Sequence, residues 1–423
     1  MTKAVSPTAR GSRRELTLQP RRICYSGNGL RSVPVEQTLA EIERHFLASN
    51  EEVQFRMFRG AQDRPTRALL KYFSPDGADK DERFFGKGAT GEQAVISACL
   101  EFIERQCARL RPADLLIEAS YAAVASDARD PRLFCLCPEA SFDPARVIDW
   151  VWGYSLTESE AVLVPANLVF LPYFADRESK FIAWNDSNGL ASGNNLEEAV
   201  LHGILEVVER DAVMIDEYNS LPRNDIAPEG LTADVRRVLA SLAVDGYACS
   251  FKCAMTDLPI AVVSAFIRHA EDPANCCAAF GCYLDPQLAF SRALTEAVQL
   301  LPPSVNQEEW FRSGASERHT ARSATAMAID DPENLATDDL RDNIERSVAM
   351  LKEFGSEVIV VDLSLSDVRF PAVRVLATGL QPLLHEGDMR LSRRFFEVPV
   401  KLGLRAAPLA LADIKIWPLC GYR

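Results

Sequence analysis

Two segments of the chain share one pattern of hydrophobic and polar positions. They are residues 86–105, GKGATGEQAVISACLEFIER, and residues 193–210, GNNLEEAVLHGILEVVER. In each segment, polar positions spaced i, i+4, i+8 and i+11 form a narrow stripe on a helix, and nearly every other position is apolar or small. A helix that is apolar on almost every side is buried inside a protein. The pattern therefore predicts two buried helices, each with one polar stripe.

The two stripes carry acids at matching positions. The first consists of Gln93, Ser97, Glu101 and Glu104, and the second of Glu198, His202, Glu206 and Glu209. An arginine follows each stripe, Arg105 in the first segment and Arg210 in the second. A weaker third copy covers residues 285–299, where Glu296 matches Glu101 and Gln299 takes the place of Glu104. These matches predict three related helices that arose by internal duplication.

Other apolar runs predict strands that alternate with helices. Residues 161–171, 258–267 and 357–363 are typical of buried strands. Residues 31–46 predict a helix that begins after Pro34 and has acidic residues in its first turn. Residues 312–339 predict a long surface loop. Together these elements predict a mixed α/β (α+β) fold with internally duplicated helix-bearing units.

The N-terminus differs in composition from the remainder of the chain. Residues 1–20 are basic and polar and contain no apolar run, so we expect them to be disordered and not to form a secretory signal. Residues 21–79 form an N-terminal region. Residues 80–423 contain the repeated helices and most of the predicted strands, and we assign them to one domain.

Composition and charge exclude several classes of protein. The chain has 423 residues, 48% of them hydrophobic, and a formal net charge of −14. An acidic chain is a poor partner for nucleic acid or an anionic membrane, because both require concentrated Lys and Arg. No stretch approaches the roughly 18 uncharged apolar residues needed to span a bilayer. The eleven cysteines lack paired zinc-ligand spacing, so we expect reduced thiols in a cytoplasmic protein.

The acidic stripes indicate a site for a hard metal ion. Buried carboxylates lose hydration and repel one another unless cations neutralise them. Oxygen ligands favour magnesium over zinc, and magnesium held by carboxylates usually also binds phosphates. The alternative is an ordinary hydrated edge, which is the common explanation for one amphipathic helix. Repetition of the stripe on two buried helices favours the metal site.

A glycine-rich turn precedes each repeated helix, GKGAT before the first and DSNGLASGNN before the second. Backbone N–H groups at such a turn, together with the helix dipole, favour a bound phosphate. The alternative is that the glycines serve only to reverse the chain. Both interpretations are open from the sequence.

Four segments of the chain resemble the YcaO-domain family. They are residues 97–105, residues 186–213 (DSNGLASGNNLEEAVLHGILEVVERDAV), residues 292–299 (RALTEAVQ) and residues 373–383 (VRVLATGLQPL). The resemblance implies a YcaO-type fold and an enzyme that uses ATP and Mg²⁺ to activate a backbone amide of a ribosomally made precursor peptide. In azoline-forming members a Cys, Ser or Thr side chain attacks the preceding carbonyl, ATP phosphorylates the resulting oxygen, and loss of phosphate completes the ring. Relatives use external sulfide to make a thioamide.

The resemblance also implies the residues of the site. The expected magnesium ligands are Glu101, Glu104, Glu206, Glu209 and Glu296. The expected nucleotide-binding residues are Ser97, Asn194, Glu198, Arg210 and Gln299. Glu101, Glu206 and Arg210 form the expected catalytic set. The acids of the two stripes are therefore selected both by their spacing and by the resemblance.

The C-terminal end departs from the azoline-forming branch. Those relatives commonly end in an alternating proline tail, whereas Pro418 is the only proline of the last ten residues here. A thioamide product or a divergent tail is therefore the alternative to ring formation. Residues 1–75 match family patterns only loosely, and no nucleotide contact is assigned to them.

The expected partners are a precursor peptide and a second protein that captures the leader peptide or delivers sulfur. No nucleic acid and no membrane is expected, and a homodimer is left open. The competing hypothesis is a scaffold that binds the precursor peptide without catalysis. The complete acidic set favours the enzyme, because a decayed site is expected to lose costly buried charges.

Overall fold

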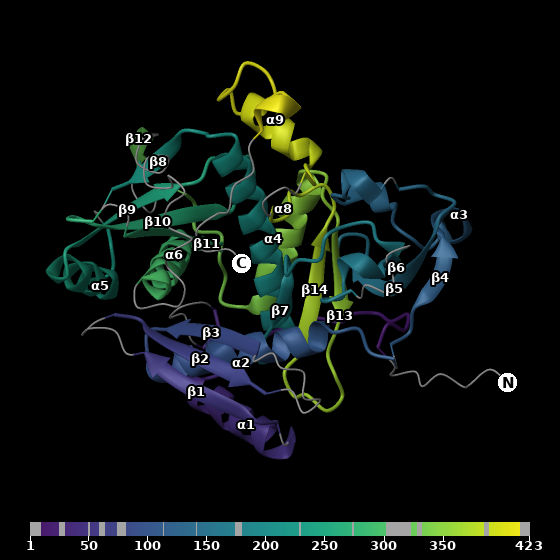
Figure 1. Cartoon of the computed structure of the whole chain (residues 1–423), viewed down its shortest axis with the longest axis horizontal. Coiled ribbons are helices and arrows are strands. Elements are labelled where there is room, and N and C mark those ends of the chain that lie inside the picture. Colours follow the sequence, from purple (N-terminus) through teal and green to yellow (C-terminus); the bar gives the residue numbers. More distant parts are fainter. Residues whose placement is uncertain are drawn as a thin grey trace.

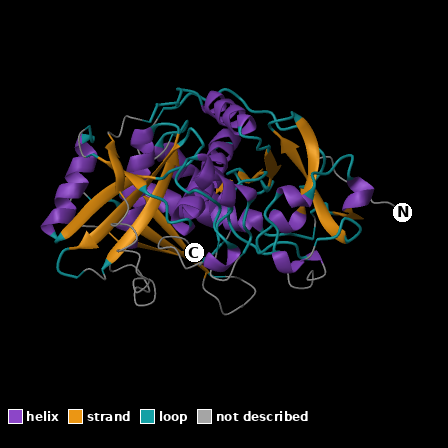
Figure 2. Ribbon diagram, turned by 90° about the horizontal axis from the view of Figure 1, so that it is seen from above, coloured by secondary structure: helices purple, strands orange, loops and turns teal. Residues whose placement is uncertain are grey.

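The computed structural model describes residues 10–24, 30–49, 51–58, 64–73, 82–112, 114–140, 142–173, 180–227, 230–272, 275–301, 323–327, 332–384 and 389–414. These residues form three β-sheets arranged around central helices (Figures 1 and 2). The sheet that contains strands β8–β12 and the sheet that contains β4–β6 lie on opposite sides of these helices, and strands β1–β3 lie below them in the view of Figure 1. A mixed α/β fold is thus confirmed.

The elements have the following bounds. The strands are β1 (Val53–Phe58), β2 (Thr66–Tyr72), β3 (Glu82–Gly88), β4 (Ile117–Ser120), β5 (Val147–Ser155), β6 (Glu160–Pro165), β7 (Leu190–Ser192), β8 (Arg223–Ile226), β9 (Tyr247–Cys253), β10 (Ala261–His269), β11 (Cys276–Tyr283), β12 (Ser323–Met327), β13 (Val358–Asp362) and β14 (Ala372–Ala377). The α-helices are α1 (Val35–Ser49), α2 (Gly91–Ala108), α3 (Tyr121–Val124), α4 (Leu196–Tyr218), α5 (Ala233–Val244), α6 (Pro286–Leu300), α8 (Leu340–Glu353) and α9 (Arg393–Lys401). Short 3₁₀ helices are η1 (Pro131–Leu133), η2 (Pro138–Ala140), η3 (Ala166–Leu168) and η5 (Leu411–Asp413).

The first sheet, in the order β1-β2-β3, is antiparallel and carries helix α2 on one face. The aromatic rings of Tyr72 and Phe84 pack against Phe102 of α2, with ring centroids 5.0 Å and 5.3 Å away. A Cβ atom at Gly86 would lie 1.9 Å from the carbonyl oxygen of Ala94. Strand β3 therefore approaches α2 so closely that only glycine fits at this position.

The second sheet, in the order β11-β10-β9-β8-β12, carries α6 in the same way. A Cβ atom at Gly281 of β11 would lie 2.3 Å from the carbonyl oxygen of Ala289 and 2.7 Å from the nitrogen of Ala293. Strand β12 pairs in parallel with β8, so part of the predicted 312–339 loop is a strand. That prediction was wrong at residues 323–327, because its Ser- and Ala-rich sequence carries no strand periodicity and only the pairing with β8 defines the strand.

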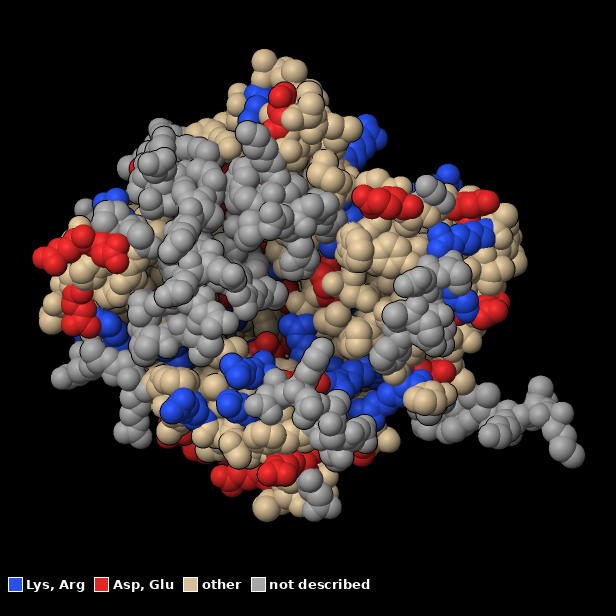
Figure 3. Space-filling model, viewed as in Figure 1, with Lys and Arg blue, Asp and Glu red and all other residues tan. Residues whose placement is uncertain are grey.

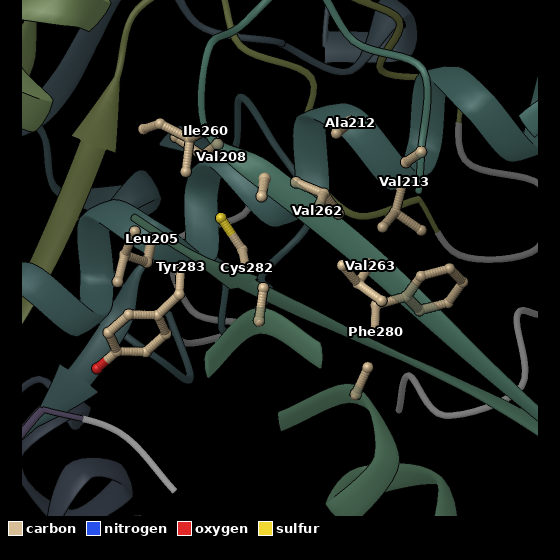
Figure 4. Close-up of a cluster of buried hydrophobic side chains, with 14 of the residues drawn as sticks. Leu205, Val208, Ala212, Val213, Ile260, Val262, Val263, Phe280, Cys282 and Tyr283 are labelled. Atoms are coloured by element: carbon tan, nitrogen blue, oxygen red, sulfur yellow. The ribbon is translucent and has the colours of Figure 1, made fainter. Parts of the chain in front are cut away.

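The third sheet has the order β4-β5-β13-β14-β7, with β6 paired to β5. Helix α4 packs on β14 and β7 and also contacts β10, β11, α8 and α9. Its apolar residues face the second sheet, where Leu205 and Val208 lie near Val262 and Cys282 (Figure 4). Contacts on several sides explain why α4 is apolar around most of its circumference, as its sequence pattern predicts.

Most of the predicted elements are present with small changes of boundary. The predicted helices correspond to α1, α2, α4 and α6, and the predicted strands to β6, β10 and β13. The strand expected at residues 161–171 ends at Pro165, where the 3₁₀ helix η3 begins. The equivalent glycine contacts of the β3–α2 and β11–α6 units agree with a duplicated unit, but the duplication itself stays a prediction.

Residues 10–20 differ from the expected disordered terminus, whereas residues 1–9 lie outside the described part of the chain. Arg10 is buried, forms an ion pair with Asp114 and donates hydrogen bonds to the carbonyl oxygens of Arg109 and Leu363 at 2.7 Å and 3.2 Å. Composition predicted disorder here because the contacts that order this segment come from residues far along the chain. Among the described helices, none is both long and apolar enough to cross a bilayer.

Candidate functional site

Helices α2 and α4 direct their acidic stripes, and α6 directs its Glu296, toward one region. The carboxylates of Glu104 on α2 and Glu206 on α4 act on each other electrostatically, as do those of Glu101 on α2 and Glu296 on α6. Figure 3 shows a hollow at the centre of this face, with acidic side chains inside it and Lys and Arg side chains along its lower rim. The tertiary structure thus brings together acids that lie up to 195 positions apart, from residue 101 to residue 296.

Burial makes these carboxylates difficult to ionise without a cation. Burial raises the pKa of Glu104 well above its usual range; Arg105 opposes this shift, while the charges of Glu206 and Glu101 add to it. Burial also raises the pKa of Glu206, against the effect of Arg210 and with that of Glu209. The pKa of Glu101 is raised by burial in spite of Arg105 and a 3.1 Å hydrogen bond that its Oε2 accepts from the backbone N–H of Phe85. The cluster is therefore short of positive charge.

Glu296 differs from the other acids because a lysine neutralises it. Lys87 of β3 places its Nζ 2.6 Å from Oε2 of Glu296. Burial opposes ionisation of Glu296, but Lys87, Arg292 and Arg210 together outweigh it and lower the pKa of the carboxyl group. Lys87 therefore links the first sheet to α6 at the edge of the site.

The arginine that follows each stripe pairs with acids of its own helix. Arg210 donates to Oε1 of Glu206 at 3.1 Å and lies 3.5 Å from Oε1 of Glu209. Arg105 lies 3.9 Å from Oε1 of Glu104. Both guanidinium groups also act on Glu206, so the two helices share their positive charges.

The amino end of α4 is bound by a segment near the N-terminus. The carboxylate of Glu198 is fully buried and accepts hydrogen bonds from the backbone N–H of Ser32 at 2.9 Å and the side-chain amide of Asn194 at 2.9 Å. Arg31 lies 3.9 Å from the same carboxylate, and Thr38 donates to Oδ1 of Asn194 at 2.8 Å. Residues 31–38 therefore form a wall of the site next to Glu198.

Two further basic groups line the site. Arg292 of α6 lies with Nη2 3.4 Å from Nε2 of His202 and stacks over Tyr283 with its Cζ 5.7 Å from the ring centroid. Arg374 of β14 forms a 3.3 Å ion pair with Asp186 and donates to the backbone oxygens of Asp186 and Leu168. Arg374 also interacts electrostatically with Glu206 and Glu104, so it adds positive charge from the third sheet.

The glycine turns have a structural explanation. A Cβ atom at Gly88 would lie 2.3 Å from Cβ of Gln93, and one at Gly193 would lie 2.7 Å from Cβ of Glu198. The N–H groups of Gln93 and Glu198 are already bound by the N-cap side chains of Thr90 and Asn195. The geometry therefore favours close packing of the turns as the reason for these glycines over phosphate binding at the helix ends.

The remaining predicted residues lie on the same helices. Ser97 is half-buried on α2 between Gln93 and Glu101, and Gln299 is half-buried near the end of α6. The backbone oxygen of Gln299 accepts a 3.1 Å hydrogen bond from Arg67 of β2. The predicted site residues thus belong to α2, α4, α6 and the turn before α4, and the roles assigned to them stay predictions.

The donor set fits magnesium bound together with a nucleotide. In the described part of the chain, no three His, Cys, Asp or Glu side chains gather around one metal position. Magnesium does not require such a cage, because it usually binds through one or two carboxylates plus phosphates and water. Half-buried carboxylates with raised pKa values and nearby arginines are suited to a magnesium–triphosphate complex and are unsuited to a soft metal.

Sequence reasoning missed several charged residues of the site. They are Arg31, Lys87, Arg292 and Arg374. Lys87, Arg292 and Arg374 lie inside segments that the sequence analysis had singled out, GKGAT, RALTEAVQ and VRVLATGLQPL. Arg31 gave no usable signal, because only the tertiary fold carries residues 31–32 to Glu198.

Comparison with known proteins agrees with this geometry. The model of one family, described as YcaO cyclodehydratase, ATP- and Mg²⁺-binding, matches residues 85–381, which is more than half of the chain. The chain belongs to the YcaO family. Its YcaO domain is therefore an ATP- and Mg²⁺-binding enzyme domain of the cyclodehydratase family.

Relatives and solved structures support the assignment. An uncharacterized protein of Methanothermobacter thermautotrophicus is 33% identical over 338 residues, which cover 75% of this chain and 86% of the relative. The YcaO structure from Methanopyrus kandleri, bound with AMPPCP and Mg²⁺, aligns with a TM-score of 0.70 at 28% identity and covers 85% of this chain and 94% of that one. A heterocyclase in complex with substrate and cofactor aligns with a TM-score of 0.84 at 23% identity. The alignment covers 96% of this chain but only 59% of the heterocyclase, and at that identity it shows the fold alone.

Proposed function

We propose that this YcaO enzyme uses ATP and Mg²⁺ to O-phosphorylate a backbone amide of a ribosomally made precursor peptide. The product is an azoline or a thioamide. The observation that carries the proposal is the convergence of half-buried carboxylates from α2, α4 and α6, with Lys and Arg side chains around them. Such an arrangement serves phosphoryl transfer, in which positioning and electrostatic stabilisation supply most of the catalysis.

The glutamates of the three helices are assigned to magnesium. They are Glu101, Glu104, Glu206, Glu209 and Glu296. Magnesium supplies charge neutralisation for the phosphate oxygens. Arg210 already donates to Glu206 at 3.1 Å, so it both orients that carboxylate and presents positive charge to the transferred phosphoryl group. Ser97, Asn194, Glu198 and Gln299 are assigned to the nucleotide with Arg210.

The two products differ in the nucleophile that completes the reaction. For an azoline, a Cys, Ser or Thr side chain of the peptide attacks the preceding carbonyl carbon and closes the ring. The resulting oxygen takes the γ-phosphoryl group with release of ADP, and phosphate leaves as the amide nitrogen loses its proton and the C=N bond forms. For a thioamide, external sulfide attacks the carbon of the O-phosphorylated amide, and the original oxygen leaves as phosphate. Pro418 and the rest of residues 415–423 lie outside the described residues.

A separate partner protein for leader capture or sulfur delivery also belongs to the proposal. The microcin synthetase McbBCD, which aligns with a TM-score of 0.56 at 13% identity, is described as a complex with pro-MccB17 bound. Full modification of a leader-bearing peptide by the isolated chain would contradict the need for a partner.

The test is calorimetric titration with a non-hydrolysable ATP analogue, with and without Mg²⁺. We expect magnesium-dependent binding that Glu206→Gln weakens about 100-fold. Glu345→Gln on α8 is the matched control, because Glu345 is exposed and pairs only with Arg341 among the described residues. Mass spectrometry of co-expressed precursor peptides then distinguishes loss of water from exchange of oxygen for sulfur. Peptide binding by a folded protein that binds no nucleotide would instead support the scaffold hypothesis.

A further inference from the structure

The first sheet has one face that is strongly basic although the whole chain is acidic. Residues that pair across an antiparallel sheet share a face. On this face, three residues of β2 each pair with one residue of β1 and one of β3. Lys71 pairs with Gln54 and Arg83, Leu69 pairs with Arg56 and Phe85, and Arg67 pairs with Phe58 and Lys87. Five of these nine side chains are basic and none is acidic. The basic residues, which we call the cationic face, are Arg56, Arg67, Lys71, Arg83 and Lys87.

The cationic face is turned away from the helix that the sheet supports. The opposite face carries Phe84 against Phe102 of α2 and Phe55 against Phe46 of α1. The sheet is therefore anchored on one side. On the other side Arg56 and Arg83 are exposed, Lys71, Arg67 and Lys87 are half-buried, and Leu69 between them is buried. Figure 3 shows Lys and Arg side chains gathered over β1–β3, directly below the central hollow.

One end of the cationic face is part of the candidate site. Lys87 contacts Glu296, and Arg67 donates to the backbone oxygens of Gln299 and Leu301 at 3.1 Å and 2.6 Å. The next position of β3 on this face is Phe85, whose side chain is 41% exposed and whose backbone N–H binds Glu101. The face thus leads from the acidic cluster outward along the sheet.

The other end of the cationic face has no acidic partner in the described part of the chain. Arg56 and Arg83 are exposed and Lys71 is half-buried, and no described carboxylate forms an ion pair with any of the three. Arg56 lies 5.8 Å from the ring centroid of Phe58. Three adjacent cations repel one another, so a negatively charged ligand would stabilise this end.

We propose that the cationic face binds an acidic segment of the precursor peptide and leads it toward the acidic cluster. From Lys87 to Arg83 the strand covers about 13 Å, at about 3.3 Å per residue. An extended peptide covers this length with about four residues, whereas a nucleotide held by the glutamates contacts only the Lys87 end. The exposed ring of Phe85 adds an apolar contact between the charges. The chain as a whole carries a net charge of −14, so the rest of its surface repels an acidic peptide and favours its binding at this face.

The inference rests on the proposed function for the identity of its ligand, so its test has two separate readouts. The first is fluorescence anisotropy with a short fluorescein-labelled Glu-rich peptide at low and at physiological ionic strength. The second is calorimetric binding of AMPPCP with Mg²⁺. The test variant is Arg56→Glu/Arg83→Glu. Its matched control, Arg237→Glu/Arg393→Glu, changes the net charge equally at two exposed helix positions.

We expect the test variant to bind the Glu-rich peptide about tenfold more weakly than the wild type and the control to remain within about twofold. Nucleotide binding should be unchanged in both. Equal peptide binding by the test variant and the wild type would overturn the inference. The inference would also be overturned if a single-stranded RNA of equal length bound more strongly than the peptide. It would likewise be overturned if the wild type and the control formed a dimer and the test variant did not. A wild type that binds the peptide but no nucleotide would overturn the proposed function and leave the cationic face in place.

Discussion

Helices α2 and α4 share one sequence pattern, yet the first position of their polar stripes has different surroundings. In α2, Gln93 closes the helix end by itself: its Oε1 accepts from the backbone N–H of Ala89 at 2.9 Å, and its own N–H binds Thr90. In α4, Glu198 is buried and binds Ser32 and Asn194. Both residues cap their own helix, because Oε2 of Glu198 also accepts from the backbone N–H of Asn194 at 3.2 Å. Glu198 in addition fastens a segment more than 150 residues away in sequence.

The comparison shows that a repeated helix can keep the acids that face the cluster while the residues nearer its N-terminus change. Glu101 and Glu206, and likewise Glu104 and Glu209, occupy matching positions and face the same cluster. Position 97 is a serine on α2, whereas its match on α4 is His202, which contacts Arg292. The last two positions of each stripe are therefore equivalent, whereas at the first two positions α4 carries different residues and makes additional contacts with distant segments.

The largest expected effect tests the shared packing of the units. Gly86→Ala and Gly281→Ala should each lower the free energy of unfolding by about 3 kcal/mol or more, because the new methyl group meets helix backbone atoms closer than 2.5 Å. Urea denaturation measures the change. Gly91→Ala is the control: its Cβ would meet only Met57, at 3.4 Å or more, so we expect no loss of stability. An unchanged midpoint for Gly86→Ala would contradict the tight β3–α2 packing.

The second prediction tests the different surroundings of Glu198 and Gln93, the first positions of the two stripes. Glu198→Ala leaves the half-buried donors of Ser32 and Asn194 without the carboxylate that they bind, and it should lower the free energy of unfolding by about 3 kcal/mol. Gln93→Ala removes only an exposed cap and should cost about 1 kcal/mol. Denaturant unfolding of both variants gives the comparison. Equal losses would show that Glu198 fastens the N-terminal segment no more firmly than Gln93 closes its own helix.

The third prediction tests whether the matching residues Glu101 and Glu206 have equivalent roles. Glu101→Gln and Glu206→Gln should each weaken magnesium-dependent nucleotide binding by about 100-fold, or about 2.7 kcal/mol, because each removes a carboxylate from one cluster. The double variant should bind only slightly more weakly than either single variant, since both residues act on one bound complex. Calorimetry measures all three affinities. Fully additive losses would mean that the two glutamates act independently.

The smallest effect tests the position where α4 has a histidine and α2 has a serine. Burial lowers the pKa of His202 well below its usual range, and Arg292, Arg31, Lys87 and Arg210 lower it further. The folded protein keeps this imidazole neutral, while the unfolded chain takes up a proton below about pH 6.5, so the stability lost on acidification should amount to about 1.4 kcal/mol per pH unit. The His202→Gln variant should lose less stability on acidification than the wild type, by this amount per pH unit. Parallel pH profiles of denaturation for the variant and the wild type would contradict it.

The acids of the site could be predicted from the sequence, whereas much of their basic surroundings could not. The spacing of Glu101, Glu104, Glu206 and Glu209 defines a helix face, and helix periodicity is a local property. Lys87 and Arg292 lie in recognised segments, but their contacts with Glu296 and His202 join different elements. The strand at 323–327 and the ordered segment at 10–20 were missed for the same reason, since their partners are distant in sequence.

The sequence by itself determined the helices, their buried character, the acidic stripes and the YcaO resemblance, because each depends on residues a few positions apart. Only the tertiary structure decided that the two stripes and Glu296 converge, that Ser32 binds Glu198, and that Lys87 neutralises Glu296. It also placed five basic residues on one face of the first sheet through the register of its strands. Strand register and helix packing depend on contacts between distant segments, and a linear pattern does not contain them.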